Sequence, residues 1–362
     1  MPTLFDPIQL GDISAPNRII MAPLTRGRAE AGHVPGDLIL THYAQRASAG
    51  LIISEATGIS QEGLGWPAAP GLWTEAQVEG WKPVTEAVHE AGGRIIAQLW
   101  HMGRLVHSSF NDGKQPVSAS ATTGPGHAHT ATGRQPLEQA RSLDIAEIPR
   151  LIADYAAAAR NAKRAGFDGV QLHGANGYLI DQFLRNNSNL REDAYGGSIE
   201  NRIRLLREVT EALIGEWGAG RVSVRLSPNG ESQGVDDSDP VPLFNAAAAS
   251  LSALGIGFLE LREPGPDGTF GATDVPKQSP EIRKHFNGPL IVNSDHTAAS
   301  AQAVMDAGVA DGVSFGRPFI SNPDLVDRIR NGAEWTQSNP MTWYSAGAEG
   351  YTDYPALASA DA

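Results

Sequence analysis

The sequence predicts an α/β fold in which one (β/α)8 barrel, a TIM barrel, occupies the whole chain. Along the 362 residues, eight short apolar runs alternate with eight longer segments of helical character. Such repeated alternation is typical of parallel strands with helices outside them. No linker rich in proline, serine or charge divides the chain. We therefore expect a single domain, residues 1–362.

The expected strands are short aliphatic runs, and the expected helices carry apolar residues at helical spacing, as in Ile148–Ala159 and Arg202–Leu213. The strands are Arg18–Ala22, Leu51–Ala56, Arg94–Leu99, Gly169–Leu172, Arg221–Leu226, Gly257–Leu261, Pro289–Val292 and Gly312–Phe315. The helices are Asp37–Ala49, Glu75–Ala91, Ile145–Ala165, Ile199–Trp217, Val241–Leu254, Pro280–Phe286, Thr297–Ala307 and Asn322–Asn331.

The two ends of the chain lie outside the expected barrel, residues 18–332, and their sequence patterns differ from its strand–helix alternation. Ile8–Asn17, with Gly11 and Asp12 at its centre, predicts a β-hairpin that caps the bottom of the barrel within residues 1–17. Residues 333–362 are rich in Trp, Tyr and Gly and predict an irregular segment docked over the site, fraying at Leu357–Ala362.

Composition excludes several classes of protein. The net charge of −13 argues against a nucleic-acid binder, whose contact surface is basic. Because the chain has no cysteine, disulfides, thiolate catalysis and iron–sulfur sites are ruled out. No targeting segment and no stretch of about 20 apolar residues is visible. We expect a cytoplasmic protein.

Three long connections follow expected strands, so they should rise from the carboxyl face where barrel enzymes hold their sites. They are Trp100–Ser142, His173–Ser198 and Leu261–Pro280. In the second, His173, Asn176 and Tyr178 offer an imidazole, an amide and a phenol within six residues. These groups can bind an oxygen-bearing ligand and deliver a proton to it. Gly174 and Gly177 let the backbone turn between them.

Other chemistries fit the strand ends less well. No lysine ends an expected strand, which argues against a Schiff-base enzyme. Glu55 and Glu260 could form the carboxylate pair of a carbohydrate-active barrel, although pairing with arginines such as Arg225 or Arg262 is the stronger expectation. No metal site is expected. His127 and His129 read as a polar surface loop, and the aspartates at positions 236, 237 and 239 as solvated.

The ends of the last two strands are compatible with a phosphate site. Ser294, Asp295 and Gly316 offer backbone N–H groups, and Arg317 adds a guanidinium. Together with Arg225 and Gln98 they indicate a ligand with a phosphate at one end and a polar ring at the other.

These strand ends lie in motifs that resemble the Old Yellow Enzyme family of FMN-dependent ene-reductases. The motifs are NRIIMAPLTR (17–26), SEATGI (54–59), AQLWHMGR (97–104), the block 167–204, VSVRLSP (222–228), FGRPFISNPDL (315–325) and EGYTDYP (349–355). They run through the whole chain and each falls at an expected strand end or in the tail. The resemblance implies a flavoprotein oxidoreductase that binds FMN without a covalent bond and is reduced by NADPH or NADH.

The resemblance also implies the residues that hold FMN. Pro23, Leu24 and Thr25 would pass along the flavin, with Thr25 bonding the ring carbonyl near N5, and Ala56 would give a backbone contact. Gln98 would bond the pyrimidine edge. Arg225 would face N1 and O2, where negative charge collects on reduction. The phosphate would rest on the backbone of Ser294, Asp295 and Gly316, with Arg317 as its counter-charge.

For the substrate, the resemblance implies an α,β-unsaturated carbonyl or nitro compound whose oxygen is held by His173 and Asn176. Hydride from N5 would reach the β-carbon, and Tyr178 would protonate the α-carbon. Trp100 and Tyr344 would wall the pocket, and turnover would be ping-pong because the nicotinamide nucleotide uses the same pocket first.

Two positions depart from the family pattern: Asn293-Ser294-Asp295 replaces a glycine-containing phosphate turn, and Trp343 precedes Tyr344. An Asp295 carboxylate beside a phosphate would be repulsive unless it turned away. A carbohydrate-active barrel and a non-catalytic flavin-binding barrel remain the alternatives.

Overall fold

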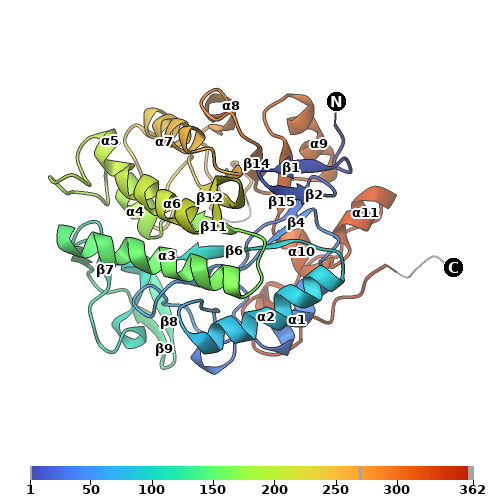
Figure 1. Ribbon diagram of the computed structural model, residues 1–362, viewed down its shortest axis with the longest axis horizontal. Helices are drawn as coiled ribbons and strands as arrows, with labels where there is room; N and C mark the ends of the chain where they lie inside the picture. Colours follow the sequence, from blue (N-terminus) through green and yellow to red (C-terminus); the bar gives the residue numbers. More distant parts are fainter. Residues whose placement is uncertain (1, 269–270, 358–362) are drawn as a thin grey trace.

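The computed structural model describes residues 2–268 and 271–357. A closed barrel of parallel strands forms its centre, with the helices around it (Figure 1). Each strand pairs with the next along the chain, and β15 returns to pair with β3, Val313 lying opposite Ile19. The predicted (β/α)8 barrel is confirmed. Its strands are β3 (Ile19–Met21), β4 (Leu51–Ile53), β6 (Ile95–Trp100), β11 (Val170–His173), β12 (Val222–Leu226), β13 (Phe258–Arg262), β14 (Leu290–Asn293) and β15 (Gly312–Phe315).

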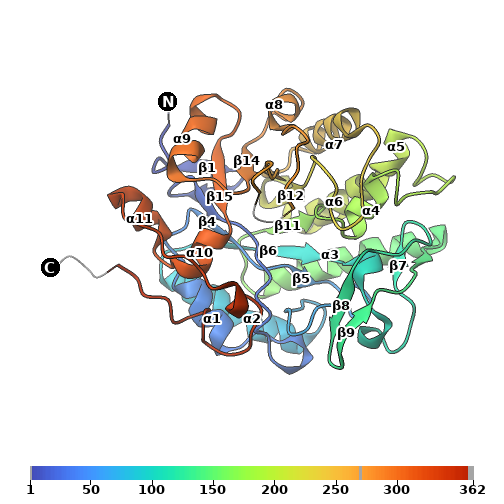
Figure 2. The same ribbon diagram turned by 180° about the vertical axis from the view of Figure 1, so that it is seen from behind.

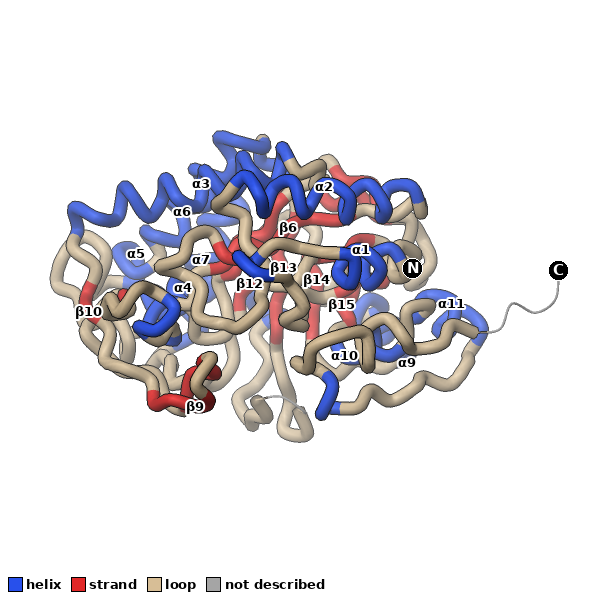
Figure 3. Tube along the Cα trace, turned by 90° about the horizontal axis from the view of Figure 1, so that it is seen from below, coloured by secondary structure: helices blue, strands red, loops and turns tan. Residues whose placement is uncertain are grey.

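The helices cover the outer face of the barrel, with the long α3 and α6 packed side by side (Figures 1 and 3). Each long helix buries an apolar stripe against the strands; α3, for example, buries Leu151, Tyr155 and Ala159. The helices are α1 (Asp37–Ala44), α2 (Glu75–Glu90), α3 (Ile148–Arg164), α4 (Leu179–Leu184), α5 (Ile199–Arg202), α6 (Arg204–Trp217), α7 (Pro240–Leu254), α8 (Ser279–Ile282), α9 (Ala298–Asp306), α10 (Arg317–Ser321) and α11 (Leu325–Asn331).

The predicted N-terminal hairpin is also confirmed. β1 (Ile8–Leu10) and β2 (Ile13–Ala15) pair antiparallel. The turn between them is pressed onto the start of β12: Asp12 N donates to Gly220 O at 2.8 Å. Gly11 has φ +63°, and a Cβ there would lie 2.1 Å from Gly220 O, so only glycine fits. Apolar side chains of the hairpin cluster with the lowest inward-facing residues of the barrel and close its amino end.

Strand periodicity decides which side chains enter the barrel, because successive residues of a strand face opposite sides. Near the amino ends the inward residues are apolar: Ile20, Leu51, Ile96, Phe258 and Ile291. Nearer the carboxyl ends of six of the eight strands, the inward residues are polar or, at Trp100, aromatic, whereas β4 continues with apolar Ile53. The six strands contribute Gln98 and Trp100 on β6, Gln171 and His173 on β11, Arg225 on β12, Glu260 and Arg262 on β13, Asn293 on β14 and Ser314 on β15. The same alternation therefore builds an apolar floor and a polar mouth.

Several expected boundaries are wrong where a connection takes over. The helix expected at Pro280–Phe286 is the single turn α8, and the one expected at Asn322–Asn331 begins only at Leu325, as α11, with the unexpected short helix α10 before it. α1 stops at Ala44, five residues early. The next residues hold Arg46 in the interior, where Nε donates to Phe319 O at 2.7 Å. A tertiary bond of this kind cannot be read from local periodicity.

The connection after β6 carries extra strands at the mouth. β7 (Val117–Ser118) pairs with β10 (Arg141–Ser142), and β8 (His127–Thr130) forms a hairpin with β9 (Gly133–Pro136). A further short strand, β5 (Thr57–Gly58), pairs with the end of β6. His127 and His129, expected in a polar surface loop, are exposed side chains of the hairpin.

The tail from residue 333 to 357 runs past α10 and α1 (Figure 2), with one 3-10 turn at Pro340–Thr342. Two arginines of the segment after β3 hold it: Arg26 Nη2 donates to Gly350 O at 2.7 Å, and Arg28 Nη2 donates to Thr342 O at 2.7 Å. Fraying was expected at Leu357–Ala362, and all of this segment after Leu357 lies outside the described residues. No helix in the described ranges is long and apolar enough to cross a membrane.

Candidate active site

A chain of hydrogen bonds crosses the inside of the barrel below its mouth. Gln98 Nε2 donates to Gln171 Oε1 at 2.8 Å, and Gln171 Nε2 donates to Glu260 Oε2 at 3.1 Å. Ser314 Oγ donates to the other oxygen of Glu260 at 2.6 Å. All four side chains are buried. A buried network with its members satisfied fixes the orientation of each side chain, so this layer supports the groups above it.

Arg225 carries the positive charge of this layer. Its Nη1 lies 3.7 Å from Glu260 Oε1, and its Nη2 donates to Asn293 Oδ1 at 2.8 Å. Burial lowers the pKa of the guanidinium and Glu260 opposes that shift, so the group stays protonated. Its Nε is buried and has no partner within the described residues. A fixed cation with a spare donor therefore faces the barrel mouth.

His173 ends β11 beside Arg225, its paired residue on β12. Burial, and next the Arg225 charge, lower the pKa of His173 well below its ordinary value. Nδ1 accepts a bond from Ala175 N at 3.3 Å, which assigns the proton of the neutral ring to Nε2. His173 is therefore a neutral hydrogen-bond donor.

Three aromatic rings meet at this point. The Tyr178 ring stands edge-on to His173 and to Trp100, with centroids 4.9 Å apart in both pairs. Trp100 is buried, and its Nε1 is unpartnered in the described part of the chain. Burial raises the pKa of Tyr178 to about 12, while Gln233 and Arg262 act in the opposite direction. The phenol is therefore protonated at neutral pH.

Asn176 lies between His173 and Tyr178 in a left-handed backbone conformation, φ +59°. Asparagine adopts this conformation more readily than other residues with a side chain. Gly177 follows with φ +78°, and a Cβ there would lie 2.4 Å from Ser232 O. The expected sharp turn is thus present. Gly174 serves a different need, since a Cβ would lie 3.0 Å from the backbone oxygen of Arg225.

On the opposite side of the mouth, half-buried Pro23, Leu24 and Thr25 follow β3, and buried Ala56 follows β4. Glu55 fixes the turn beyond them: its Oε2 accepts from the backbone nitrogens of Arg26 and Gly27, at 3.0 and 3.3 Å. Burial raises the pKa of this carboxyl.

The ends of β14 and β15 bring together the residues expected around a phosphate. Ser294 and Asp295 have φ of +118° and +50°, conformations that favour glycine. This explains why a glycine-containing turn suits the position. The Asp295 carboxylate faces the Arg317 guanidinium, with Oδ1 3.5 Å from Nη1. Gly316 precedes Arg317, and Leu24 lies within 3.3 Å of the position of a Cβ at Gly316.

The tail contributes two aromatic side chains. Tyr344 is 54% exposed and stands edge-on to Trp66, with the centroids 5.2 Å apart. Trp343 lies under the Arg317 guanidinium, 5.4 Å from ring centroid to Cζ, and its Nε1 donates to Ser338 Oγ at 3.0 Å. Trp343 therefore links the tail to the end of β15.

These donors fit FMN. Arg225 has an unpartnered buried Nε. The Thr25 hydroxyl has no protein partner among the described residues, and the half-buried Arg317 supplies a positive charge at the β15 end. A ring with an acceptor edge and a phosphate tail matches that set.

The carboxylates of the carbohydrate-active alternative are otherwise engaged. Glu55 caps a backbone turn, and Glu260 lies within the barrel network bonded to Gln171 and Ser314. The expected pairing of Glu260 with Arg225 is present, whereas Arg262 contacts Asn176 instead. The described residues contain no cluster of three or more His, Asp and Glu that could hold a metal.

Sequence reasoning missed the residues that support the loop carrying Asn176. Asp237, expected in water, is buried and forms an ion pair with Arg202 at 2.5 Å. Asp181 in α4 and Arg185 at its C-cap form a second buried pair, whose i, i+4 spacing was a usable signal. Ser227 and Gln233 contact Asn176 from the connection after β12, and Arg262 contacts it from the end of β13. No local sequence pattern predicts such contacts.

Fold and site together define a class: barrel flavoproteins that use FMN and a nicotinamide nucleotide. The family model of the NADH:flavin oxidoreductase / NADH oxidase family matches residues 3–335. The chain belongs to this family, as the motifs predicted.

Individual relatives agree over the full length. The chain is 60% identical to an old yellow enzyme homologue of known structure from Zymomonas mobilis, covering 98% of this chain and 99% of that one, with a TM-score of 0.96. Morphinone reductase in complex with tetrahydroNAD is 46% identical over 100% and 99% of the two chains, TM-score 0.94. A probable flavin mononucleotide-dependent alkene reductase from Leishmania infantum is 40% identical over 97% of each chain.

Proposed function

We propose that this protein reduces the activated C=C bond of α,β-unsaturated carbonyl or nitro compounds with NADPH or NADH, using non-covalently bound FMN. The observation that carries the proposal is the grouping of His173, Asn176 and Tyr178 beside the buried cation Arg225 at one barrel mouth. The relatives support the same chemistry: the tetrahydroNAD complex belongs to morphinone reductase, and the Leishmania protein is described as an alkene reductase.

The FMN seat is assigned to both sides of the mouth. Pro23, Leu24, Thr25 and Ala56 would lie along the ring, with Gln98 at its pyrimidine edge, and Arg225 would meet the charge that reduction places there. Ser294, Asp295 and Gly316 would give backbone contacts to the phosphate, and Arg317 its counter-charge. When bound, FMN supplies the hydride that reaches the β-carbon of the alkene, after its own reduction by the nicotinamide nucleotide.

The substrate oxygen is held by two neutral donors. His173 offers Nε2–H because its Nδ1 is an acceptor, and Asn176 offers its amide N–H. Both polarise the conjugated alkene, and both bonds strengthen as negative charge develops on the oxygen. A neutral imidazole suits this role, because it loses no proton while the ligand binds. Trp100 and Tyr344 would border the ligand.

Tyr178 gives the second hydrogen, as a proton to the α-carbon. Its pKa of about 12 makes it a weak acid, so the developing carbanion must be close before transfer occurs. Arg262 lies near enough to lower the pKa of the phenol and would stabilise the phenolate that is left.

The test uses the purified wild-type protein. We expect a yellow protein whose flavin absorbance is released by heat, and NADPH oxidation that depends on an added enone such as 2-cyclohexen-1-one. A yellow protein that oxidises no nucleotide with any electron-poor alkene would instead be a non-catalytic flavin carrier. Activity that survives complete flavin removal would point to the carbohydrate-active alternative.

The absence of cysteine favours a cytoplasmic location.

A further inference from the structure

Asn176 is held at three of its four polar atoms. Its backbone N donates to Ser227 Oγ at 2.8 Å, and its backbone O accepts from Gln233 Nε2 at 2.7 Å. Its side-chain Oδ1 accepts from Arg262 Nη1 at 3.4 Å. A guanidinium only donates, so the amide must present its oxygen to Arg262. Only Nδ2 then lacks a partner in the described structure, and it is the donor that the substrate oxygen needs.

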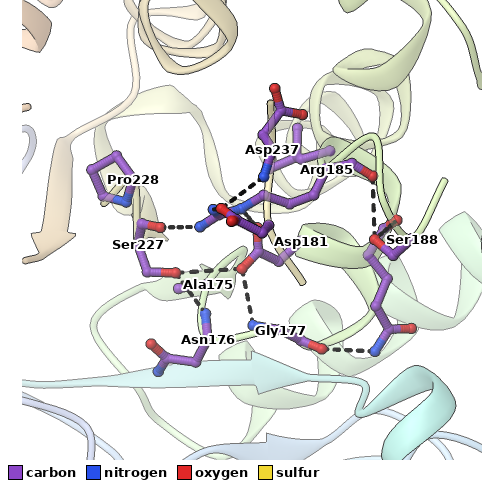
Figure 4. A network of polar contacts seen from close by, with 12 residues as sticks. Ala175, Asn176, Gly177, Asp181, Arg185, Ser188, Ser227, Pro228 and Asp237 are labelled. Carbon is purple, nitrogen blue, oxygen red and sulfur yellow. Dashed lines mark hydrogen bonds and ion pairs between the residues drawn. The ribbon is translucent and has the colours of Figure 1, made fainter. Parts of the chain in front are cut away.

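Ser227 is itself braced by buried charge (Figure 4). Its Oγ lies 3.4 Å from Asp181 Oδ2, which also accepts from Gly177 N at 2.9 Å. Asp181 Oδ1 accepts from Arg185 Nε at 3.0 Å, and both side chains are fully buried. Arg185 also donates to the backbone oxygens of Ser227 and Gly230. The ion pair therefore holds the turn at Gly177 and the segment after β12 at Ser227 and Gly230.

We propose that Ser227, braced by the Asp181–Arg185 pair, is a positioning residue that sets the carbonyl-binding amide of Asn176. This inference rests on the proposed function. Two successive left-handed residues belong to no helix or strand, so this turn needs an outside anchor. Ser227 directly follows β12, two residues after Arg225. One rigid strand thus carries both the cation assigned to the flavin and the anchor of the substrate clamp, which fixes their separation.

The inference is tested in Ser227→Ala. The probe is 4-hydroxybenzaldehyde, an oxygen-bearing ligand for the donors of the clamp. Because the loop loses the bond from Asn176 N to Ser227 Oγ, this probe should bind about five- to tenfold more weakly, and reoxidation of the reduced flavin by 2-cyclohexen-1-one should slow by a similar factor. Ser223→Ala is the matched control. Ser223 is a buried serine of the same strand, but its Oγ bonds to Val170 O at 3.4 Å, away from Asn176. We expect this variant to stay within twofold of wild type, and both to keep full FMN content.

A double-mutant cycle separates positioning from general damage. The background is Asn176→Gly, which removes the amide and tolerates a positive φ. Adding Ser227→Ala to it should change ligand affinity less than twofold. An undiminished loss in this background, or equal losses in Ser227→Ala and Ser223→Ala, would overturn the inference.

Should Ser227→Ala not fold, Gln233→Ala gives a second route, since Gln233 is near the surface and holds the Asn176 backbone oxygen. Gln233→Ala should weaken the binding of 4-hydroxybenzaldehyde severalfold, and it should have no such effect when it is added to Asn176→Gly. Unchanged binding in Gln233→Ala alone would overturn the inference. The wild-type assay is read first: absence of enone turnover there refutes the proposed function, whereas normal wild-type turnover with an unaffected Ser227→Ala refutes only the positioning role.

Discussion

Two regions of the barrel mouth hold their charges in opposite ways. In the clamp loop, residues 173–185, Asp181 and Arg185 pair at 3.0 Å with no side-chain exposure. In the phosphate corner, which we define as Ser294, Asp295, Gly316 and Arg317, the pair Asp295–Arg317 lies at 3.5 Å with side chains 40% and 26% exposed. The first pair is locked among backbone groups and the second faces solvent.

The difference matches what each region has to do. A carbonyl clamp must orient single N–H donors, and an error of about an ångström would weaken their effect on the developing charge. A phosphate has several acceptor oxygens and tolerates small shifts of its counter-charge. Buried charge is a costly way to stabilise a fold, but it can specify one conformation. We therefore interpret the clamp loop as built for orientation and the phosphate corner as built for exchangeable binding.

The largest expected effect comes from breaking the buried pair. Asp181→Ala leaves the buried Arg185 guanidinium with only the exposed Asp236 carboxylate, 3.7 Å away, as counter-charge, and we expect about 3 kcal/mol of lost stability. Asp295→Ala, in the exposed pair, should cost less than about 1 kcal/mol. Urea unfolding of the apoprotein, followed by circular dichroism, measures both, because differences in FMN affinity then do not enter the comparison. Similar losses would remove the contrast between the regions.

The second prediction concerns chemistry within the clamp loop. Tyr178→Phe keeps the ring contacts with Trp100 and His173 but removes the proton, so reoxidation of the flavin by 2-cyclohexen-1-one should slow about 100-fold. Reduction by NADPH should change less than threefold. Stopped-flow absorbance resolves the two half-reactions. Tyr155→Phe is the matched control: it lies in α3, outside the assigned site, its hydroxyl has no partner in the described residues, and it is expected within twofold in both. Equal slowing of both halves by Tyr178→Phe would contradict a proton-donor role.

How far the sequence predicted the site depends on whether a residue lies in a strand or in a loop. Strand alternation alone places Gln98, His173 and Arg225 on one inner surface, and the structure brings them together. The barrel follows from the same periodicity. Helix ends were less predictable. α1, for example, ends at Ala44, and the residues that follow place Arg46 in the interior, where it makes a buried hydrogen bond to Phe319 O.

Loop contacts were beyond prediction for a physical reason. Ser227 and Asn176 are 51 positions apart in sequence and meet only because β11 and β12 are neighbours. Asp237 looked solvated beside Asp236 and Asp239, since charge runs usually face water, yet it pairs with buried Arg202. Motif resemblance supplied roles for Asn176 and Tyr178, but it supplied none for the residues that hold them.

The third prediction uses the depressed pKa of His173. The native state keeps this ring neutral, whereas an unfolded histidine takes up a proton below its ordinary value of about 6.5. Stability is therefore lost as pH falls below about 6.5, by at most about 2 kcal/mol at pH 5 for one proton. His173→Gln should shrink the difference in unfolding free energy between pH 7.5 and pH 5 by up to that amount. His127→Gln, on the exposed hairpin, should leave it unchanged; an unchanged difference in His173→Gln would show that the ring is not held neutral.

The fourth prediction has the smallest expected effect and tests whether the Asp295 carboxylate in the phosphate corner weakens FMN binding. Asp295 lies in the corner assigned to the FMN phosphate and faces Arg317. Its carboxylate would therefore repel the phosphate and would also pair with the guanidinium that should balance the phosphate charge. Asp295→Asn keeps the side-chain shape and frees Arg317. We expect FMN to bind about two- to fivefold more tightly, with the gain shrinking at high salt because the groups are exposed. Fluorescence titration of the apoprotein at two ionic strengths measures it. Weaker binding would mean that the Asp295 side chain holds FMN directly, and the phosphate corner would then share the fixed geometry of the clamp loop.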